Sequence, residues 1–186
     1  WYKVTEEMLF CWREILERVP KSRLLVKCQE FFAPVMQEEA LRRMRKTGMD
    51  IARVDLEPAT SDYMKRYLAV DLALDTYPYP GGGMTCDALF MGVPVITRYG
   101  RRRGSRFGLS LLKNAGFAEL AAADDKSYVE KAVSLAHDAE LLDGLHKTLR
   151  MKFAASPVMQ AANYLGELEQ FYRMAVGWKK EEPGKR

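Results

Sequence analysis

The sequence predicts an α/β fold in which short parallel strands are flanked by helices, followed by a helical last third. Apolar, strand-like runs alternate with helical patterns as far as residue 116, and from residue 126 onward only helical patterns follow. Strands separated by helices favour a parallel sheet covered on both faces. A chain of 186 residues fits one large domain, 1–186, with a substantial core.

The first part of the chain alternates helix and strand. Thr5 is the predicted N-cap of a helix that ends near Val19, because apolar residues recur behind it at helical spacing and Pro20 follows. After this helix the patterns predict a strand over 23–27, a helix over 37–46, a strand over 51–56, a helix over 62–69 capped by Ser61, and a strand over 71–74.

Beyond a glycine-rich loop the patterns predict a helix over 85–91, a strand over 94–97, and a helix from a Ser105 cap to Asn114 that Gly116 closes. The late helices are predicted over 126–136, 139–151 and 157–178, the last with Ser156 as its cap. This last helix has an apolar stripe of Leu165, Leu168, Tyr172 and Ala175. Such a stripe is typical of packing, so we expect the helices over 126–178 to pack on the domain. The length of the last helix also suits contact with a neighbouring domain.

Composition excludes several classes of protein. No apolar run approaches the roughly 20 residues that span a bilayer, so no membrane association is expected. The three cysteines form no CxxC pair, which argues against a zinc site or a disulfide framework and favours a cytoplasmic setting. A net charge of +4 with mixed signs argues against a nucleic-acid partner. Arg101–Arg103 are a local exception, interpreted either as solvated loop charge or as contacts for an anion.

Residues 72–96, LALDTYPYPGGGMTCDALFMGVPVI, are the most informative stretch. Glycines between a strand and a helix let a ligand approach the backbone, and the free N–H groups at the start of a helix favour a phosphate. A carboxylate one turn inside, Asp87, is well placed to accept hydrogen bonds from ribose hydroxyls. The stretch therefore predicts half of a nucleotide-sugar site, with a tight strand–helix connection as the purely structural alternative. It contains neither GxGxxG nor a P-loop.

Four segments stand out along the chain: YKVTEEMLFCWREILERVPKSRLLVK, LALDTYPYPGGGMTCDALFMGVPVIT, GSRFGLSLL and SPVMQAANYLGELEQFY. Together they resemble the C-terminal catalytic half of protein O-GlcNAc transferases, above all SPINDLY-like and TPR-containing bacterial relatives. The resemblance implies the Rossmann-like donor lobe of a two-lobed GT-B glycosyltransferase, with UDP-GlcNAc as substrate and no cofactor. It further implies that the chain is a fragment whose partners are an N-terminal catalytic lobe, TPR repeats and an acceptor protein.

The resemblance also implies roles for individual residues. Lys3 matches a lysine that contacts the UDP diphosphate and would neutralise charge on the leaving group, although a solvated lysine is the simpler interpretation. Asp87 matches an acid that binds the ribose. The remaining expected donor-binding residues surround the uracil (Pro58, Tyr63 and Arg66) or line the phosphates (Gly82, Gly83, Met84 and Thr85).

Two departures from the family pattern bear on activity. Tyr63 replaces the histidine of animal enzymes, and glycines, methionine and Pro80 replace hydroxyl and amide side chains around the phosphates. The backbone N–H groups that could donate hydrogen bonds to the phosphates are unaffected by these side-chain changes.

The function implied is inverting, metal-independent transfer of GlcNAc to Ser or Thr, by a chain that is inactive without the missing lobe. A lobe for another nucleotide sugar, a degenerate protein-interaction module and, more distantly, a nucleic-acid module remain alternatives.

Overall fold

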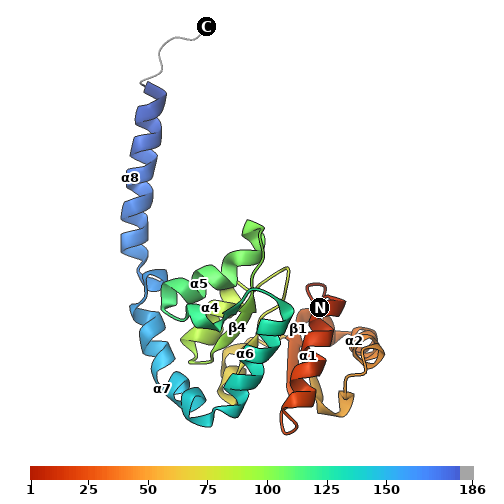
Figure 1. Ribbon diagram of the computed structural model, residues 1–186. Coiled ribbons are helices and arrows are strands. Elements are labelled where there is room, and N and C mark those ends of the chain that lie inside the picture. Colours follow the sequence, from red (N-terminus) through yellow and green to blue (C-terminus); the bar gives the residue numbers. More distant parts are fainter. Residues whose placement is uncertain (181–186) are drawn as a thin grey trace.

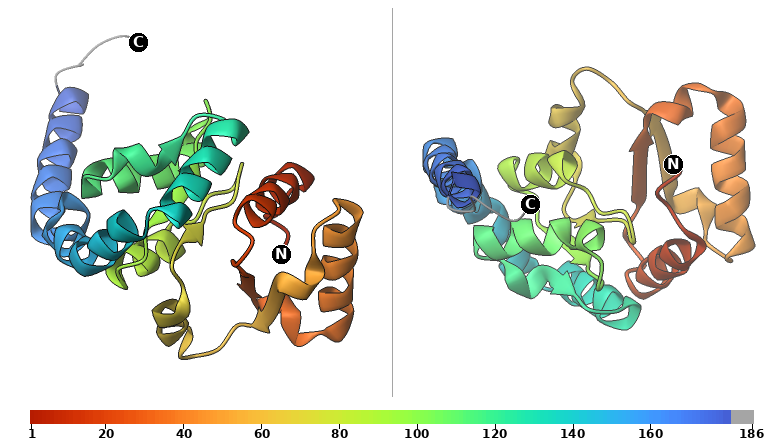
Figure 2. Two further views of the ribbon diagram at one scale, coloured as in Figure 1. Left: turned by 60° about the horizontal axis from the view of Figure 1, so that its bottom comes forward. Right: turned by 90° about the horizontal axis from the view of Figure 1, so that it is seen from above.

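The computed structural model describes residues 1–180, with side chains as far as Gly177. It confirms the α/β, Rossmann-like class: parallel strands lie among helices (Figures 1 and 2). The strands are β1 (Leu24–Cys28), β2 (Val54–Pro58), β3 (Ala73–Leu74), β4 (Val95–Arg98) and β5 (Ala121–Ala122). The helices are α1 (Glu6–Arg18), α2 (Pro34–Lys46), α3 (Tyr63–Arg66), α4 (Gly83–Phe90), α5 (Phe107–Ala115), α6 (Asp125–His137), α7 (Ala139–Ala155) and α8 (Ala161–Lys180). Short 3-10 turns lie at 29–32, 51–53, 67–69, 103–106, 118–120 and 157–159.

The strands form two parallel sheets where one was expected. β1 pairs with β2 along its whole length, from Leu24 opposite Val54 to Cys28 opposite Pro58. The second sheet has the order β3-β4-β5, and its pairings are only two residues long. β5 was missed because the pair Ala121–Ala122 is too short to show an alternating pattern.

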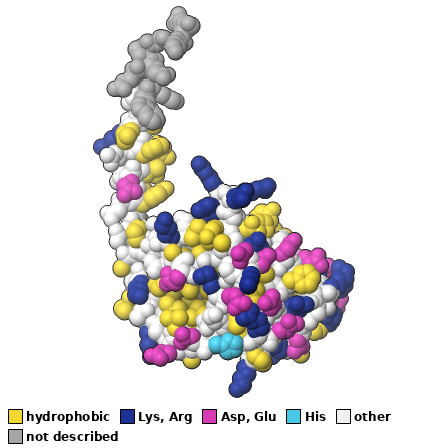
Figure 3. Space-filling model, viewed as in Figure 1, with side chains coloured by type: hydrophobic (Ala, Val, Ile, Leu, Met, Phe, Trp, Pro, Cys, Tyr) yellow, Lys and Arg dark blue, Asp and Glu magenta, His cyan; other side chains and the backbone are white. Residues whose placement is uncertain are grey.

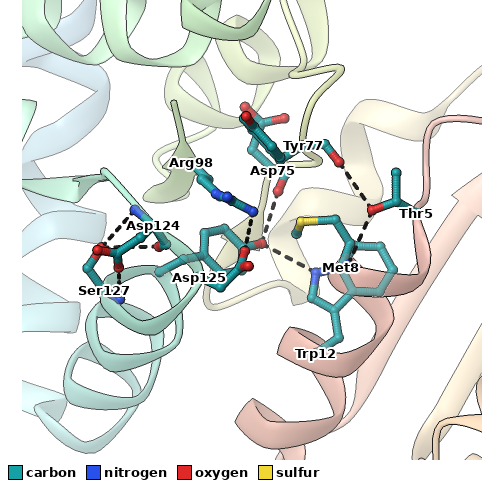
Figure 4. A network of polar contacts seen from close by, with 10 residues as sticks. Thr5, Met8, Trp12, Asp75, Tyr77, Arg98, Asp124, Asp125 and Ser127 are labelled. Atoms are coloured by element: carbon teal, nitrogen blue, oxygen red, sulfur yellow. Dashed lines mark hydrogen bonds and ion pairs between the residues drawn. The ribbon is translucent and has the colours of Figure 1, made fainter. Parts of the chain in front are cut away.

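Two buried hydrogen bonds through Tyr128 connect α1 to the end of β3. Trp12 on α1 donates from Nε1 to Tyr128 Oη on α6 at 3.3 Å, and Tyr128 Oη donates to the Asp75 carbonyl at 3.0 Å (Figure 4). Tyr128 is fully buried and Trp12 nearly so. The bonds tie α1, which lies beside the first sheet, to the end of β3 in the second (Figure 1).

Helix boundaries follow the local chemistry in some places and tertiary contacts in others. Thr5 caps α1 by accepting from the Met8 N–H, and Gly116 ends α5 with φ of 83°, both as predicted. Ser61 caps no helix, since α3 begins after Asp62. Ser105 does not cap α5 either: it is buried and its Oγ donates to the Arg102 carbonyl, so α5 begins only at Phe107.

The expectation that all late helices pack on the domain is wrong for α8. α6 and α7 lie against the body, whereas α8 projects from it (Figures 1 and 3). Tyr164, Leu165 and Tyr172 are 63%, 54% and 60% exposed. The helix follows a 3-10 turn that Ser156 precedes and Gln160 ends. Within residues 1–177, Leu165 and Tyr172 of its stripe are exposed, and Leu168 and Ala175 are half-buried. No helix in the described part of the chain combines the length and apolar character needed to cross a bilayer.

Candidate functional site

The loop after β3 is folded back onto its own strand by Asp75. This carboxylate is 8% exposed. Its Oδ1 accepts from the N–H groups of Thr76 at 2.9 Å and Gly81 at 2.6 Å, and its Oδ2 accepts from Thr97 Oγ1 at 2.7 Å. Asp75 therefore fixes the position of Gly81, immediately before the two glycines at the start of α4.

The first residues of the chain lie against this loop. Burial raises the pKa of Asp75, and hydrogen bonds from Gly81 and Thr97, together with the positive charge of Lys3, oppose that rise. Thr5 Oγ1 donates to the Tyr77 carbonyl at 3.4 Å, which anchors the segment after Lys3 (Figure 4). This hydrogen bond therefore attaches the segment that begins just after Lys3, the residue expected at the diphosphate, to the loop after β3.

The glycines of the loop differ in what surrounds them. A Cβ on Gly81 would lie 2.7 Å from Thr85 Oγ1, so packing requires that glycine. A Cβ on Gly82 or Gly83 would meet nothing within 4 Å. Because α4 begins at Gly83, this open space adjoins the N–H groups of its first turn, where an anion is favoured. Thr85 itself is 3% exposed and faces Gly81, so its hydroxyl lies under the loop.

Tyr63 and Asp87 meet across the gap between α3 and α4. Tyr63 Oη donates to Asp87 Oδ2 at 2.9 Å. This hydrogen bond and the negative charge of Asp87 raise the pKa of Tyr63, so the phenol keeps its proton at neutral pH. Two residues expected at different parts of one nucleotide, the base and the ribose, are therefore in direct contact.

Pro58 and Arg66 lie at the end of β2. Pro58 is the last residue of that strand, and Arg66 pairs with Glu57 at 2.8 Å. Arg66, then Lys27, whose Nζ lies 3.3 Å from the same carboxylate, lower the pKa of Glu57. Within the described residues no hydrogen bond of Arg66 reaches α4, so the structure does not join it directly to Asp87.

Sequence reasoning missed Tyr67. Its Oη donates to the Met84 carbonyl at 3.3 Å, and burial, then the nearby Asp87, raises its pKa to about 12. The Met84 side chain, by contrast, is 55% exposed. The signal for Tyr67 was its spacing of four residues from Tyr63, which places both on one side of a helix.

Known proteins of one glycosyltransferase family are similar to nearly the whole chain. The model of glycosyl transferase family 41 matches residues 1–168. The probable UDP-N-acetylglucosamine–peptide N-acetylglucosaminyltransferase SPINDLY of Solanum lycopersicum is 38% identical over 174 residues, covering 92% of this chain and 19% of that protein. Its counterpart from Arabidopsis thaliana is 38% identical over 181 residues, covering 96% and 20%.

A solved structure agrees with these relatives. A mutant O-GlcNAc transferase of Thermobaculum terrenum superposes with a TM-score of 0.86 at 32% identity, over 92% of this chain and 34% of that one. The chain spans about a fifth of the length of the curated relatives named above. Because the family model matches all but its last residues, the chain belongs to glycosyl transferase family 41.

Proposed function

We propose that this chain is the donor-binding lobe of a UDP-GlcNAc-dependent protein glycosyltransferase. The observation that carries the proposal is the open space at Gly82 and Gly83, one helical turn before the Asp87 carboxylate. Backbone N–H groups at a helix start suit a diphosphate, and a carboxylate at this distance suits ribose hydroxyls. The names of the family relatives, which include UDP-N-acetylglucosamine and a peptide acceptor, support the choice of substrates.

In this proposal the chain binds the nucleotide and stabilises its departure. The N–H groups of Gly82, Gly83, Met84 and Thr85 face the diphosphate, and the Lys3 ammonium neutralises charge on it as UDP leaves. Asp87 accepts hydrogen bonds from the ribose. Tyr63 stacks on the uracil, with Pro58 and Arg66 at its edge.

The reaction is a direct displacement with inversion at the anomeric carbon. A Ser or Thr oxygen of the acceptor bonds to that carbon, and the bond from the carbon to the diphosphate oxygen breaks. UDP departs with the electron pair, and the hydroxyl proton passes to a base supplied from outside this chain. The partners are therefore an N-terminal catalytic lobe, TPR repeats and an acceptor protein. No cofactor, nucleic acid or membrane takes part, and the setting is cytoplasmic.

Calorimetric titration of this chain with UDP and GDP tests the proposal. We expect UDP to bind in the micromolar to millimolar range and Asp87→Ala or Lys3→Ala to weaken it about tenfold or more, since each removes a charged contact. Asp71→Ala and Lys113→Ala, which change exposed charges elsewhere, are matched controls.

Each alternative gives a different result. Preference for GDP indicates a lobe for another nucleotide sugar. Absence of any nucleotide binding by a chain with normal circular dichroism favours a protein-interaction module. GlcNAc transfer by the isolated chain contradicts the placement of the base outside it.

A further inference from the structure

The segment between β4 and α5 carries Arg101–Arg103, which none of the roles above uses. All three side chains are exposed, and within the described residues none forms an ion pair. Arg23 and Arg66, by contrast, each lie 2.8 Å from a carboxylate oxygen. Figure 3 shows Lys and Arg side chains standing out from the top of the body, over this segment. Three uncompensated positive charges are therefore concentrated at one place.

The backbone that carries these arginines is held firmly at both ends. On the C-terminal side, the buried Ser105 donates to the Arg102 carbonyl from its Oγ at 2.8 Å and from its N–H at 3.1 Å. On the N-terminal side, Gly100 lies so close to Tyr77 that a Cβ would come within 2.7 Å of the phenol oxygen. The ring of Tyr77 is in turn covered by the Arg98 guanidinium at 3.9 Å. A surface fixed in this way loses little entropy when it binds a partner.

Large apolar side chains are exposed at the same edge of the second sheet. Phe107, directly after the arginine segment, is 59% exposed, and Tyr79 in the loop after β3 is also 59% exposed. Because β3 and β4 are parallel, the loops that follow them meet at one edge, where α4 also begins. The arginines thus adjoin the proposed donor site, and their surroundings offer both charge and apolar contact.

We propose that Arg101–Arg103 and Phe107 form a docking surface for an acidic peptide segment of the acceptor protein. A guanidinium binds a carboxylate through two parallel hydrogen bonds, and a concentration of unpaired positive charge attracts an acidic partner. In the proposed function the diphosphate binds at the start of α4, so it does not need these arginines. Nucleic acid fits less well, because charges elsewhere on the chain are of mixed sign. The assignment of the diphosphate to α4 and the identification of the partner as the acceptor both rest on the proposed function.

Fluorescence anisotropy with labelled peptides tests this surface. The probe has a serine between two runs of glutamate, and its partner peptide has glutamine in place of every glutamate. The test variant combines Arg101→Gln, Arg102→Gln and Arg103→Gln. The matched control combines Lys21→Gln, Arg45→Gln and Lys46→Gln, which removes three exposed positive charges elsewhere. UDP binding of every variant is measured in parallel.

We expect the glutamate peptide to bind, more weakly as salt rises, and the glutamine peptide not to bind. The test variant should lose about tenfold in affinity or more, and the control and UDP binding should change little. Equal loss in the control, unchanged peptide binding in the test variant, or tighter arginine-dependent binding of a single-stranded oligonucleotide would each overturn the proposal. Loss of UDP binding alone would reassign the arginines to the donor. Failure of UDP to bind any variant, with peptide binding intact, would reject the donor lobe and keep the surface.

Discussion

Tyr63 Oη donates a hydrogen bond to Asp87 Oδ2 at 2.9 Å, so the proposed uracil-stacking residue holds the proposed ribose-binding carboxylate. The bond joins α3 to α4. A ribose hydroxyl that binds Asp87 must share or displace the phenol. Tyr63 therefore acts on donor affinity in two opposite ways, through its ring and through its hydroxyl.

Tyr63→Phe and Tyr63→Ala separate these two effects. Tyr63→Phe keeps the ring and removes the competing donor, so UDP should bind a few-fold more tightly, because such a hydrogen bond contributes about 1 kcal/mol. Tyr63→Ala also removes the ring and should bind UDP about tenfold more weakly than Tyr63→Phe, since stacking on a base contributes about 1–3 kcal/mol. Calorimetry measures both. Equal weakening by both variants would mean that the hydroxyl orients Asp87 for the ribose.

Gly108 is expected to be essential to the fold, because it lies against the hydrogen bond from Thr97 to Asp75, called here the Asp75 clamp. A Cβ at this position would be 2.2 Å from Thr97 Oγ1 and 2.8 Å from Asp75 Oδ2. Gly108→Ala should therefore push apart a buried hydrogen-bonded pair and lower the free energy of unfolding by about 3 kcal/mol or more.

Gly104→Ala is the matched control, since a Cβ there meets nothing within 4 Å. Its free energy of unfolding should stay within about 0.5 kcal/mol of the wild type. Urea denaturation measures the free energy of unfolding of both variants. Similar values for the two would show that Thr97 and Asp75 can move apart at little cost in stability.

Local chemistry made part of this structure predictable. Thr5 and Gly116 act within one helical turn of themselves, so their roles follow from the sequence. The helix over 85–91 was placed almost correctly, because Gly83 begins it and Gly92 follows its end. The parallel arrangement followed from the alternation of elements, but the division into two sheets depends on strand pairings that no local pattern specifies.

The features that the sequence did not predict depend on tertiary contacts. Ser105 resembles a cap in sequence, yet its hydroxyl bonds to the Arg102 carbonyl three residues before it, and its burial depends on residues packed around it. The apolar residues of α8 recur at helical spacing whether or not another element covers them, so the sequence pattern could not show that this helix projects from the body. In the site, the glycine run and Asp87 were visible in the sequence, but the contact between Tyr63 and Asp87 joins residues 24 apart. Their proposed roles in donor binding stay predictions.

Two phenylalanines on neighbouring helices should differ sharply in their contribution to stability. Phe153 on α7 is fully buried, and Phe153→Ala should cost about 3–5 kcal/mol through lost burial and the cavity left behind. Phe171 on α8 is 63% exposed, and Phe171→Ala should change the free energy of unfolding by less than about 0.5 kcal/mol. Urea denaturation of this chain measures both. A large loss for Phe171→Ala would show that α8 packs on the body in solution.

Tyr128→Phe should destabilise the chain at neutral pH and progressively less so in alkali. At pH 8 the change leaves the Trp12 N–H and the Asp75 carbonyl without their shared partner, at a cost of about 1–3 kcal/mol. Burial raises the pKa of Tyr128 well above its ordinary value of 10.0. The folded state therefore keeps the phenolic proton at a pH where the unfolded state loses it, so the wild type loses stability as pH rises above 10.

Phenylalanine has no proton to lose, so the stability gap between wild type and variant should narrow by about 0.8 kcal/mol between pH 8 and pH 10.5. Urea denaturation of both chains at the two pH values measures the gap. The other groups that titrate in alkali and have raised pKa values are present in both chains and cancel in the difference; they are Cys11, Cys28, Tyr63, Tyr67 and Cys86. A gap that stays constant or widens would mean that Tyr128 ionises in the folded protein as readily as in the unfolded chain, which its burial between α1 and β3 should prevent.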